Sequence, residues 1–230
     1  VASLCFNLRA DEGMWIPMLL QNNEQDMQEM GMNITAEDIY SINHSSMKDA
    51  VVLFDGGCTG EIVSNQGLLL TNHHCGFDWM QYHSTVEHDY LTHGFWAMSK
   101  EEELPCPGIS AVMLKSMEDV TDRVLEGVTK ETSNDERAEI VTENIKKIKE
   151  NAEANSDYQV VIKSFYHGNK YYMIYNEVFK DVRMVGAPPS NIGKFGGDTD
   201  NWVWPRHTGD FSVFRIYVSP DGKAADYSED

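Results

Sequence analysis

Short apolar runs separated by turn-forming residues dominate the hydrophobic pattern of this chain. Runs of four to eight residues that are rich in Val, Ile, Leu, Tyr and Phe, and that are bounded by Gly, Asn, Asp or Ser, are typical of β-strands. Two turn sequences, Asn-Gln-Gly at 65–67 and His-Gly-Asn at 167–169, join neighbouring runs into hairpins. The pattern predicts strands at residues 50–54, 60–64, 68–71, 109–115, 158–166, 170–179 and 211–218.

Helical periodicity is strongest between residues 133 and 155. There the apolar side chains recur every three or four positions and form one stripe, which predicts an amphipathic helix. The stripe consists of Ala138, Val141, Ile145, Ile148 and Ala152. The lysines at 146, 147 and 149 fall on the opposite face, where a solvated role explains them.

The N-terminal region and the middle of the chain have weaker patterns. Residues 14–40 predict two short helices, and Thr35 followed by Asp38 matches a capping pattern at the start of the second. Residues 76–105 are rich in aromatic side chains and His, and we expect them to form loops. The predicted fold class is mainly β, with peripheral helices and one inserted helix.

Composition and charge narrow the function. The 230 residues are 41% hydrophobic, which is enough for a packed core and excludes a globally disordered chain. Eighteen Lys and Arg against 37 Asp and Glu give a net charge of −19, which argues against nucleic acid as a partner. The sequence has no apolar run near the roughly 18 residues that a membrane span needs, so we expect none.

The first residues and the cysteines point to export. Residues 1–10 resemble the end of a signal peptide that is cleaved after Ala10, and Cys5 would leave with it. Cys58 and Cys75 flank a two-strand segment that could bring them together, and a bridge there would contribute about 3 kcal/mol in an oxidising compartment. Cys106 is left as a buried thiol or as the partner of a cysteine beyond residue 230.

Two segments carry candidate chemistry. In the first, a hairpin ends in His74 directly before Cys75, so a disulfide there would hold the imidazole rigidly, as a general base requires. The second, residues 196–211, is rich in glycine, carboxylates and tryptophan and leads straight into a strand. Loops of this composition commonly bind a ligand.

Together these segments resemble the trypsin-like serine peptidases, in which His, Asp and Ser follow one another along the chain. Longer strings are similar to the bacterial dipeptidyl-peptidase 7 and 11 family: GLLLTNHHCG at 67–76, HSTVEHDYLTHGFW at 83–96 and PPSNIGKFGGDTDNWVWPRHTGDFSVF at 188–214. The resemblance covers most of residues 11–222. It implies a chymotrypsin-like double β-barrel peptidase domain, of which residues 11–230 would be the N-terminal part.

The resemblance also implies roles for individual residues. His74 matches the catalytic base and Asp210 the residue that orients it, while Asn201 and Trp202 match the positions that hold the free α-amino group of the substrate. A disulfide between Cys58 and Cys75 agrees with the family pattern. The expected reaction releases dipeptides from peptides with a free N-terminus. It needs no cofactor or metal, and the family resemblance implies a homodimer at the periplasm or cell surface.

One departure from the family is large. The nucleophilic serine, its oxyanion-hole glycines and the specificity pocket belong to a part of the family pattern that residues 1–230 do not contain, and no Gly-x-Ser-x-Gly sequence occurs among them. The helical domain that caps the family's cleft is also outside this sequence. We therefore expect residues 1–230 by themselves to be inactive.

Several alternatives stay open. The neighbour of His74, His73, is interpreted as structural, and the aspartates at 198 and 200 as turn residues that compete with Asp210 for the orienting role. His83, His88 and His93 recur every five residues near His73, His74 and Cys75, which allows a zinc site although no metal-binding motif is present. A non-catalytic peptide-binding module on a peptidase-like barrel is the remaining alternative.

Overall fold

The computed structural model describes residues 15–193, 208–224 and 226. The chain divides into two compact units, Val1–Met47 and Lys48–Asp230. The first unit is helical in its described part: η1 (Pro17–Asn23), α1 (Glu24–Glu29) and α2 (Ala36–Ile39). Thr35 caps α2 in a reciprocal arrangement with Asp38, so the predicted cap and the short helices of this region are confirmed.

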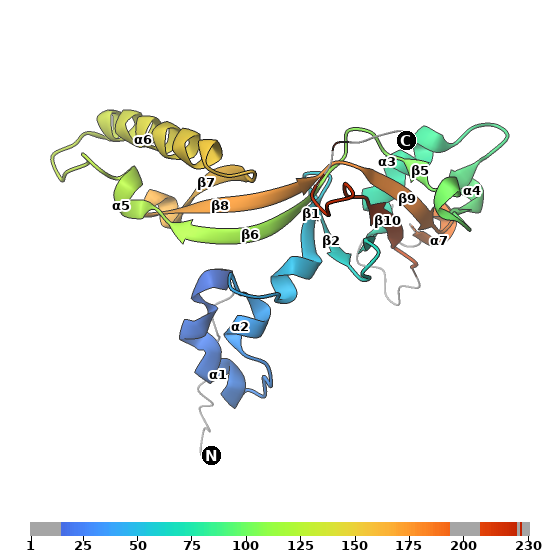
Figure 1. The fold of residues 1–230 in the computed structure, drawn as a ribbon, viewed down its shortest axis with the longest axis horizontal. Helices are drawn as coiled ribbons and strands as arrows, with labels where there is room; N and C mark the ends of the chain where they lie inside the picture. Colours follow the sequence, from blue (N-terminus) through green and yellow to red (C-terminus); the bar gives the residue numbers. More distant parts are fainter. Residues whose placement is uncertain (1–14, 194–207, 225, 227–230) are drawn as a thin grey trace, which may run out of the picture. The chain divides into compact units, whose positions relative to one another are not determined.

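The second unit is built on one ten-stranded antiparallel sheet (Figure 1). The strand order is β4-β9-β10-β3-β2-β1-β6-β8-β7, with β5 also paired to β9. The strands are β1 (Val51–Phe54), β2 (Cys58–Ile62), β3 (Leu68–Thr71), β4 (Phe95–Trp96), β5 (Leu104–Pro105), β6 (Ala111–Asp119), β7 (Gln159–Phe165), β8 (Lys170–Phe179), β9 (Val182–Ala187) and β10 (Ser212–Ile216). All seven predicted strands are present, each within a few residues of its predicted bounds.

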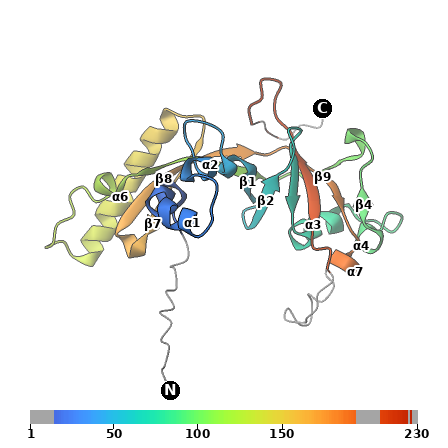
Figure 2. The ribbon, with the colours of Figure 1, turned by 90° about the horizontal axis from the view of Figure 1, so that it is seen from below.

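Helical segments alternate with these strands along the chain. They are η2 (Met47–Ala50), α3 (His73–His83), α4 (Tyr90–His93), η3 (Lys100–Glu102), α5 (Thr121–Val124), α6 (Asn134–Ala154), η4 (Tyr166–Gly168) and α7 (Ser190–Gly193). The predicted long helix is α6, which begins at a Ser133 capping box and lies along β7 and β8 (Figures 1 and 2). Its three lysines are exposed and pair with glutamates four residues away, as a solvated face predicts.

The sheet supports two hydrophobic cores. One lies between α6 and the strands β7 and β8, with Val141, Ile148, Val160 and Met173 among its buried residues. The other lies under β1, β3, β9 and β10, where the Phe54 and Phe214 rings pack 4.7 Å apart. The second core is the one that supports the candidate site, because α3 packs on β9 and β10 beside it.

Residues 76–105 correct the sequence prediction, since they contain α3, α4, β4 and β5 rather than loops alone. The physical reason is visible in α3. Its buried face consists of His73, Gly76 and Met80, which have helical spacing but include a polar residue and a glycine. Hydrophobic periodicity reveals a helix only when its buried face is apolar, and the buried face of α3 is not. None of the described helices has the length and apolar character to cross a membrane.

Cys106 is a buried thiol in the second core, and its surroundings make it chemically inert. The side chain is fully buried, and burial raises its pKa to about 12. At pH 8 only about one thiol in ten thousand would then be ionised, so we expect iodoacetamide to leave Cys106 unmodified in the folded protein and to alkylate it in urea. Peptide mass spectrometry measures this, and rapid alkylation of the folded protein would contradict the described burial.

Candidate active site

The candidate site lies where β3 leads into α3. Asn72 is the N-cap of α3, so the next two residues, His73 and His74, occupy the first helical turn. Cys75 follows and is bonded to Cys58 in β2, with the two Cα atoms 6.2 Å apart. The disulfide predicted from the sequence is therefore present. The sequence predicted His74 at the end of a hairpin. In the structure it lies instead in the first turn of α3, and the disulfide links this helix to β2.

Asp210 lies beside the end of β3, although it is far from β3 in sequence. It stands two residues before β10, and β10 pairs antiparallel with β3 so that Ser212 lies opposite Thr71. The end of β3 and the start of β10 thus coincide in space although about 140 residues separate them. This pairing is what brings the carboxylate of Asp210 to the imidazole of His74.

The Asp210 carboxylate holds His74 through two groups. Nδ1 of His74 lies 2.9 Å from Oδ2 and 3.2 Å from Oδ1, and the backbone N–H of His74 donates to Oδ1 at 3.1 Å. An ionised carboxylate can only accept hydrogen bonds, so Nδ1 is the donor, and in the neutral form of this imidazole Nε2 has the free lone pair. The His74 side chain is 63% exposed, against 29% for Asp210. The arrangement is an accessible, oriented imidazole that can take up a proton at Nε2.

His73 points the other way, into the protein. Its ring is fully buried, and Nε2 lies 3.1 Å from the carbonyl oxygen of Pro188. The ring also packs so closely on Gly193 that an added Cβ there would be 2.3 Å from it. The two adjacent histidines therefore differ in environment as the sequence interpretation held: His73 is a packed core residue, and His74 faces the surface.

The predicted amine-binding residues, Asn201 and Trp202, and the aspartates at 198 and 200 lie outside the described residues. The two ends of their segment are described. The hydroxyl of Thr208 lies 3.0 Å from the carbonyl oxygen of Ile192 and 3.0 Å from that of Gly193, and both oxygens accept from it. The backbone N–H of Gly209 donates to the carbonyl oxygen of Ile192 at 2.9 Å. Ile192 and Gly193 on one side of this segment are therefore hydrogen bonded to Thr208 and Gly209 on the other, close in sequence to Asp210.

The histidines considered for a zinc site are not brought together in the described part of the chain. His83 is bonded to the carbonyl oxygen of Pro105 at 2.9 Å, its pKa is lowered by burial, and the His88 ring stacks on Tyr90. Among the described residues, the group of ligand-type side chains that does converge is Cys58, His74 and Cys75. In that group the sulfurs are bonded to each other, so neither is a thiolate ligand.

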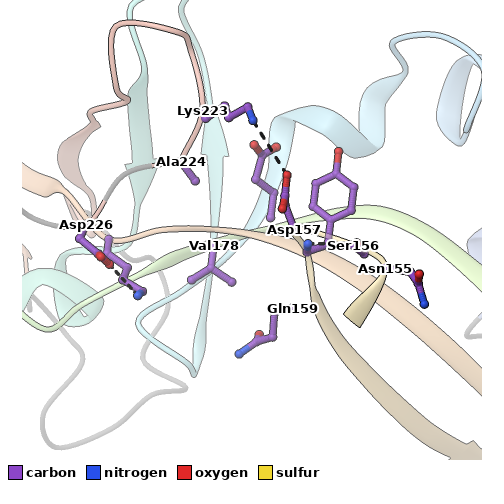
Figure 3. Close-up of a pocket in the computed structure, with 11 residues that line it drawn as sticks. Asn155, Ser156, Asp157, Gln159, Val178, Lys223, Ala224 and Asp226 are labelled. Atoms are coloured by element: carbon purple, nitrogen blue, oxygen red, sulfur yellow. Dashed lines mark hydrogen bonds and ion pairs between the residues drawn. The ribbon is translucent and has the colours of Figure 1, made fainter. Parts of the chain in front are cut away.

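A polar pocket of about 820 Å³ lies elsewhere, between the start of β7 and the end of β8 (Figure 3). Its charged lining residues are paired, since Lys180 bonds Asp226 at 2.7 Å and Lys223 lies 3.9 Å from Asp157. Glu177, which also lines it, pairs with Lys115 at 3.3 Å. Neither His74 nor Asp210 lines this pocket, so the candidate chemistry and the cavity are separate features of the described structure.

Known proteins are similar to nearly the whole chain. The sequence model described as Peptidase S46 matches residues 10–230. The chain belongs to the peptidase S46 family. An Asp/Glu-specific dipeptidyl-peptidase of Flavobacterium psychrophilum is 55% identical over 95% of the chain, and a dipeptidyl-peptidase 7 of Capnocytophaga gingivalis is 51% identical over 96%. In both cases the aligned region is 31% of the relative's own length.

Solved structures agree with these sequence matches. The crystal structure of Porphyromonas endodontalis DPP11 in complex with the dipeptide Arg-Glu matches 96% of the chain with a TM-score of 0.82 at 50% identity, and the match covers 33% of that protein. The predicted fold class, mainly β and chymotrypsin-like with peripheral and inserted helices, is confirmed, and the sheet is antiparallel. The chain spans about a third of the length of the relatives it matches.

Proposed function

We propose that the protein containing this chain is a serine-type dipeptidyl-peptidase, and that residues 11–230 supply the His–Asp portion of its peptidase domain. The observation that carries this proposal is the 2.9 Å contact between Nδ1 of His74 and the carboxylate of Asp210, on an imidazole that is otherwise exposed. Membership of the S46 family and relatives named as dipeptidyl-peptidases support the reaction class.

In this proposal His74 acts first as general base and then as general acid. Nε2 would take the proton of a serine hydroxyl as that oxygen attacks the scissile carbonyl, and would return it to the leaving amine. Asp210 would keep the proton of the neutral imidazole on Nδ1 and stabilise the imidazolium that forms. The nucleophilic serine and the oxyanion donors would come from outside residues 1–230.

Release of dipeptides requires recognition of a free α-amino group at a fixed distance from the scissile bond. We assign this role to Asn201 and Trp202, by an amide oxygen and an aromatic face that attract an ammonium group. The assignment rests on the resemblance of residues 188–214 to the dipeptidyl-peptidase family and is supported by membership of the S46 family. The relative DPP11 has been solved with the dipeptide Arg-Glu bound, which fits a product of this length.

The side-chain preference would be set outside this portion of the protein. Residues 1–230 are 55% identical to an Asp/Glu-specific enzyme and 51% identical to a dipeptidyl-peptidase 7, so this region is nearly as similar to one as to the other. Export with residues 1–10 as leader, a periplasmic or surface location, and a homodimer of the full-length protein complete the proposal. The relatives are bacterial proteins, and the proposed export rests on the signal-like residues 1–10 and the family resemblance.

The test is an assay of the full-length protein on fluorogenic X-Asp, X-Leu and X-Phe substrates, each with a free and with an acetylated N-terminus. We expect cleavage of the free-amine forms and a loss of kcat/KM of about 100-fold or more on acetylation, since the charged ammonium group that the site would recognise is then removed. Equal cleavage of both forms would contradict exopeptidase action. No cleavage of any substrate by folded protein would favour the peptide-binding module.

A further inference from the structure

Asn72 stands at the start of α3 but does not cap it. Asparagine at this position ordinarily accepts a hydrogen bond from the backbone of the first helical turn. Here the side chain makes no such bond. Its Nδ2 lies instead 3.3 Å from Oδ2 of Asp210 and 3.3 Å from the main-chain oxygen of Asp210. A residue whose type favours capping therefore has its side chain directed at the candidate catalytic carboxylate.

The chemistry of these contacts fixes the orientation of the amide. Both atoms of Asp210 that face Asn72 are acceptors, so the NH₂ group must point toward them and the amide oxygen away. One amide group thus bridges the main chain and the carboxylate of the same residue. Because the same amide group contacts the main chain and the carboxylate of Asp210, it restricts rotation of the carboxylate that Nδ1 of His74 must meet.

Asn72 is itself held in place from β10. Its main-chain oxygen accepts hydrogen bonds from the hydroxyl of Ser212 at 2.7 Å and from the N–H of Cys75 at 3.2 Å. Ser212 is fully buried, and Gly76 packs so tightly on it that an added Cβ would lie 2.7 Å from its hydroxyl oxygen. The mounting of Asn72 is therefore more rigid than its exposed side chain would suggest.

We propose that Asn72 is a positioning residue that acts on His74 through Asp210. The inference rests on the proposed function and adds to it the Asn72 amide, which orients the carboxylate that in turn orients the imidazole. Among the described residues, Asn72 is the side-chain donor to Asp210 besides His74, and its hydrogen bond favours the carboxylate orientation that meets Nδ1. Nothing in the proposal requires Asn72 to touch substrate.

The test uses full-length protein with Asn72→Ala and Asn72→Asp. A hydrogen bond to a carboxylate at an exposed site contributes modestly, so we expect Asn72→Ala to lower kcat about tenfold with KM changed less than about twofold. Asn72→Asp keeps the shape, removes the donor and sets a second carboxylate against Asp210, so it should lower kcat further. Asn155→Ala and Asn155→Asp, at an asparagine that bonds the main chain of α6 instead, should leave kcat unchanged.

A double-mutant cycle separates positioning from a general structural role. If Asn72 acts through the carboxylate, Asn72→Ala should cost about tenfold beside an intact Asp210 and less than twofold in an Asp210→Ala background, measured in single-turnover experiments. An equal loss in both backgrounds, or no loss in either, would overturn the proposal. Full activity of His74→Ala in the same assay would instead overturn the proposed function, so the two failures are distinguishable.

Discussion

Substitution of His74 by Ala in the full-length protein is expected to lower kcat for dipeptide release by about 10⁴-fold or more, with little change in KM. Without the imidazole nothing would take the proton of the attacking hydroxyl, and in serine peptidase triads loss of this base has an effect of that size. Asp210→Asn should cost about 10⁴-fold as well, because an amide that donates to Nδ1 would stabilise the wrong tautomer. Steady-state kinetics on the preferred free-amine substrate measures both.

The matched control is His88→Ala. His88 is an exposed histidine of the same unit whose ring stacks on Tyr90, and its loss should leave kcat within about twofold of wild type. Circular dichroism should show that all three variants are folded. If folded His74→Ala keeps more than a tenth of the wild-type kcat, His74 is not the general base.

Removal of Glu103 is expected to destabilise the second unit strongly. Nε of Arg215 donates to Oε1 of Glu103 at 2.8 Å, and the Tyr217 hydroxyl donates to Oε2 at 2.8 Å. Only 2% of the Glu103 side chain and 11% of the Arg215 side chain are exposed. Burial, with Glu103 beside the phenol, raises the pKa of Tyr217 to about 12. Glu103→Ala would leave a buried guanidinium without its carboxylate, at a cost of about 3–5 kcal/mol.

The measurement is native-state hydrogen exchange followed on peptides that contain β10, since those amides report opening of the sheet at Arg215. Lys147→Ala is the comparison. Lys147 pairs with Glu143 at 2.7 Å, but both side chains are 67% exposed, so its loss should change the free energy of opening by less than about 0.5 kcal/mol. A Glu103→Ala effect as small as the Lys147→Ala effect would show that the buried pair does not hold the sheet together.

Local patterns were sufficient for much of the fold. The seven predicted strands, the α6 helix and the Thr35–Asp38 cap follow from patterns of residues close in sequence, and all are present. The Cys58–Cys75 disulfide belongs to the same class, because the hairpin of β2 and β3 closes a separation of 17 residues. The helix, the cap and the disulfide are stabilised by contacts within one element or between sequence neighbours, whereas the strands also pair over long separations, as β10 does with β3.

Other parts of the fold depend on tertiary contacts that composition does not show. Strand β9 was not predicted, since Arg183 and Gly186 interrupt its apolar pattern. In the structure Arg183 donates a hydrogen bond to the carboxylate of Asp181. Gly186 is needed because an added Cβ would lie 2.3 Å from the Trp96 ring. Helix α3 was missed because its buried face includes His73.

The candidate site itself was found by family resemblance and not by spacing. His74 and Asp210 meet only through the pairing of β3 with β10, and no local pattern predicts a contact over that separation. Asn72 was not singled out for the same reason. From the sequence, an asparagine before a helix is expected to be an ordinary N-cap. Its contact with Asp210 depends on the pairing of β10 with β3.

The central claim is that His74 activates a serine that lies outside residues 1–230. The most direct measurement is labelling of the full-length protein with a fluorophosphonate probe, followed by peptide mass spectrometry, in wild type and in His74→Ala. The account predicts one labelled serine, beyond residue 230, and a labelling rate at least about 10³-fold lower in the variant. A labelled serine within residues 1–230, or an unchanged rate in His74→Ala, would contradict it.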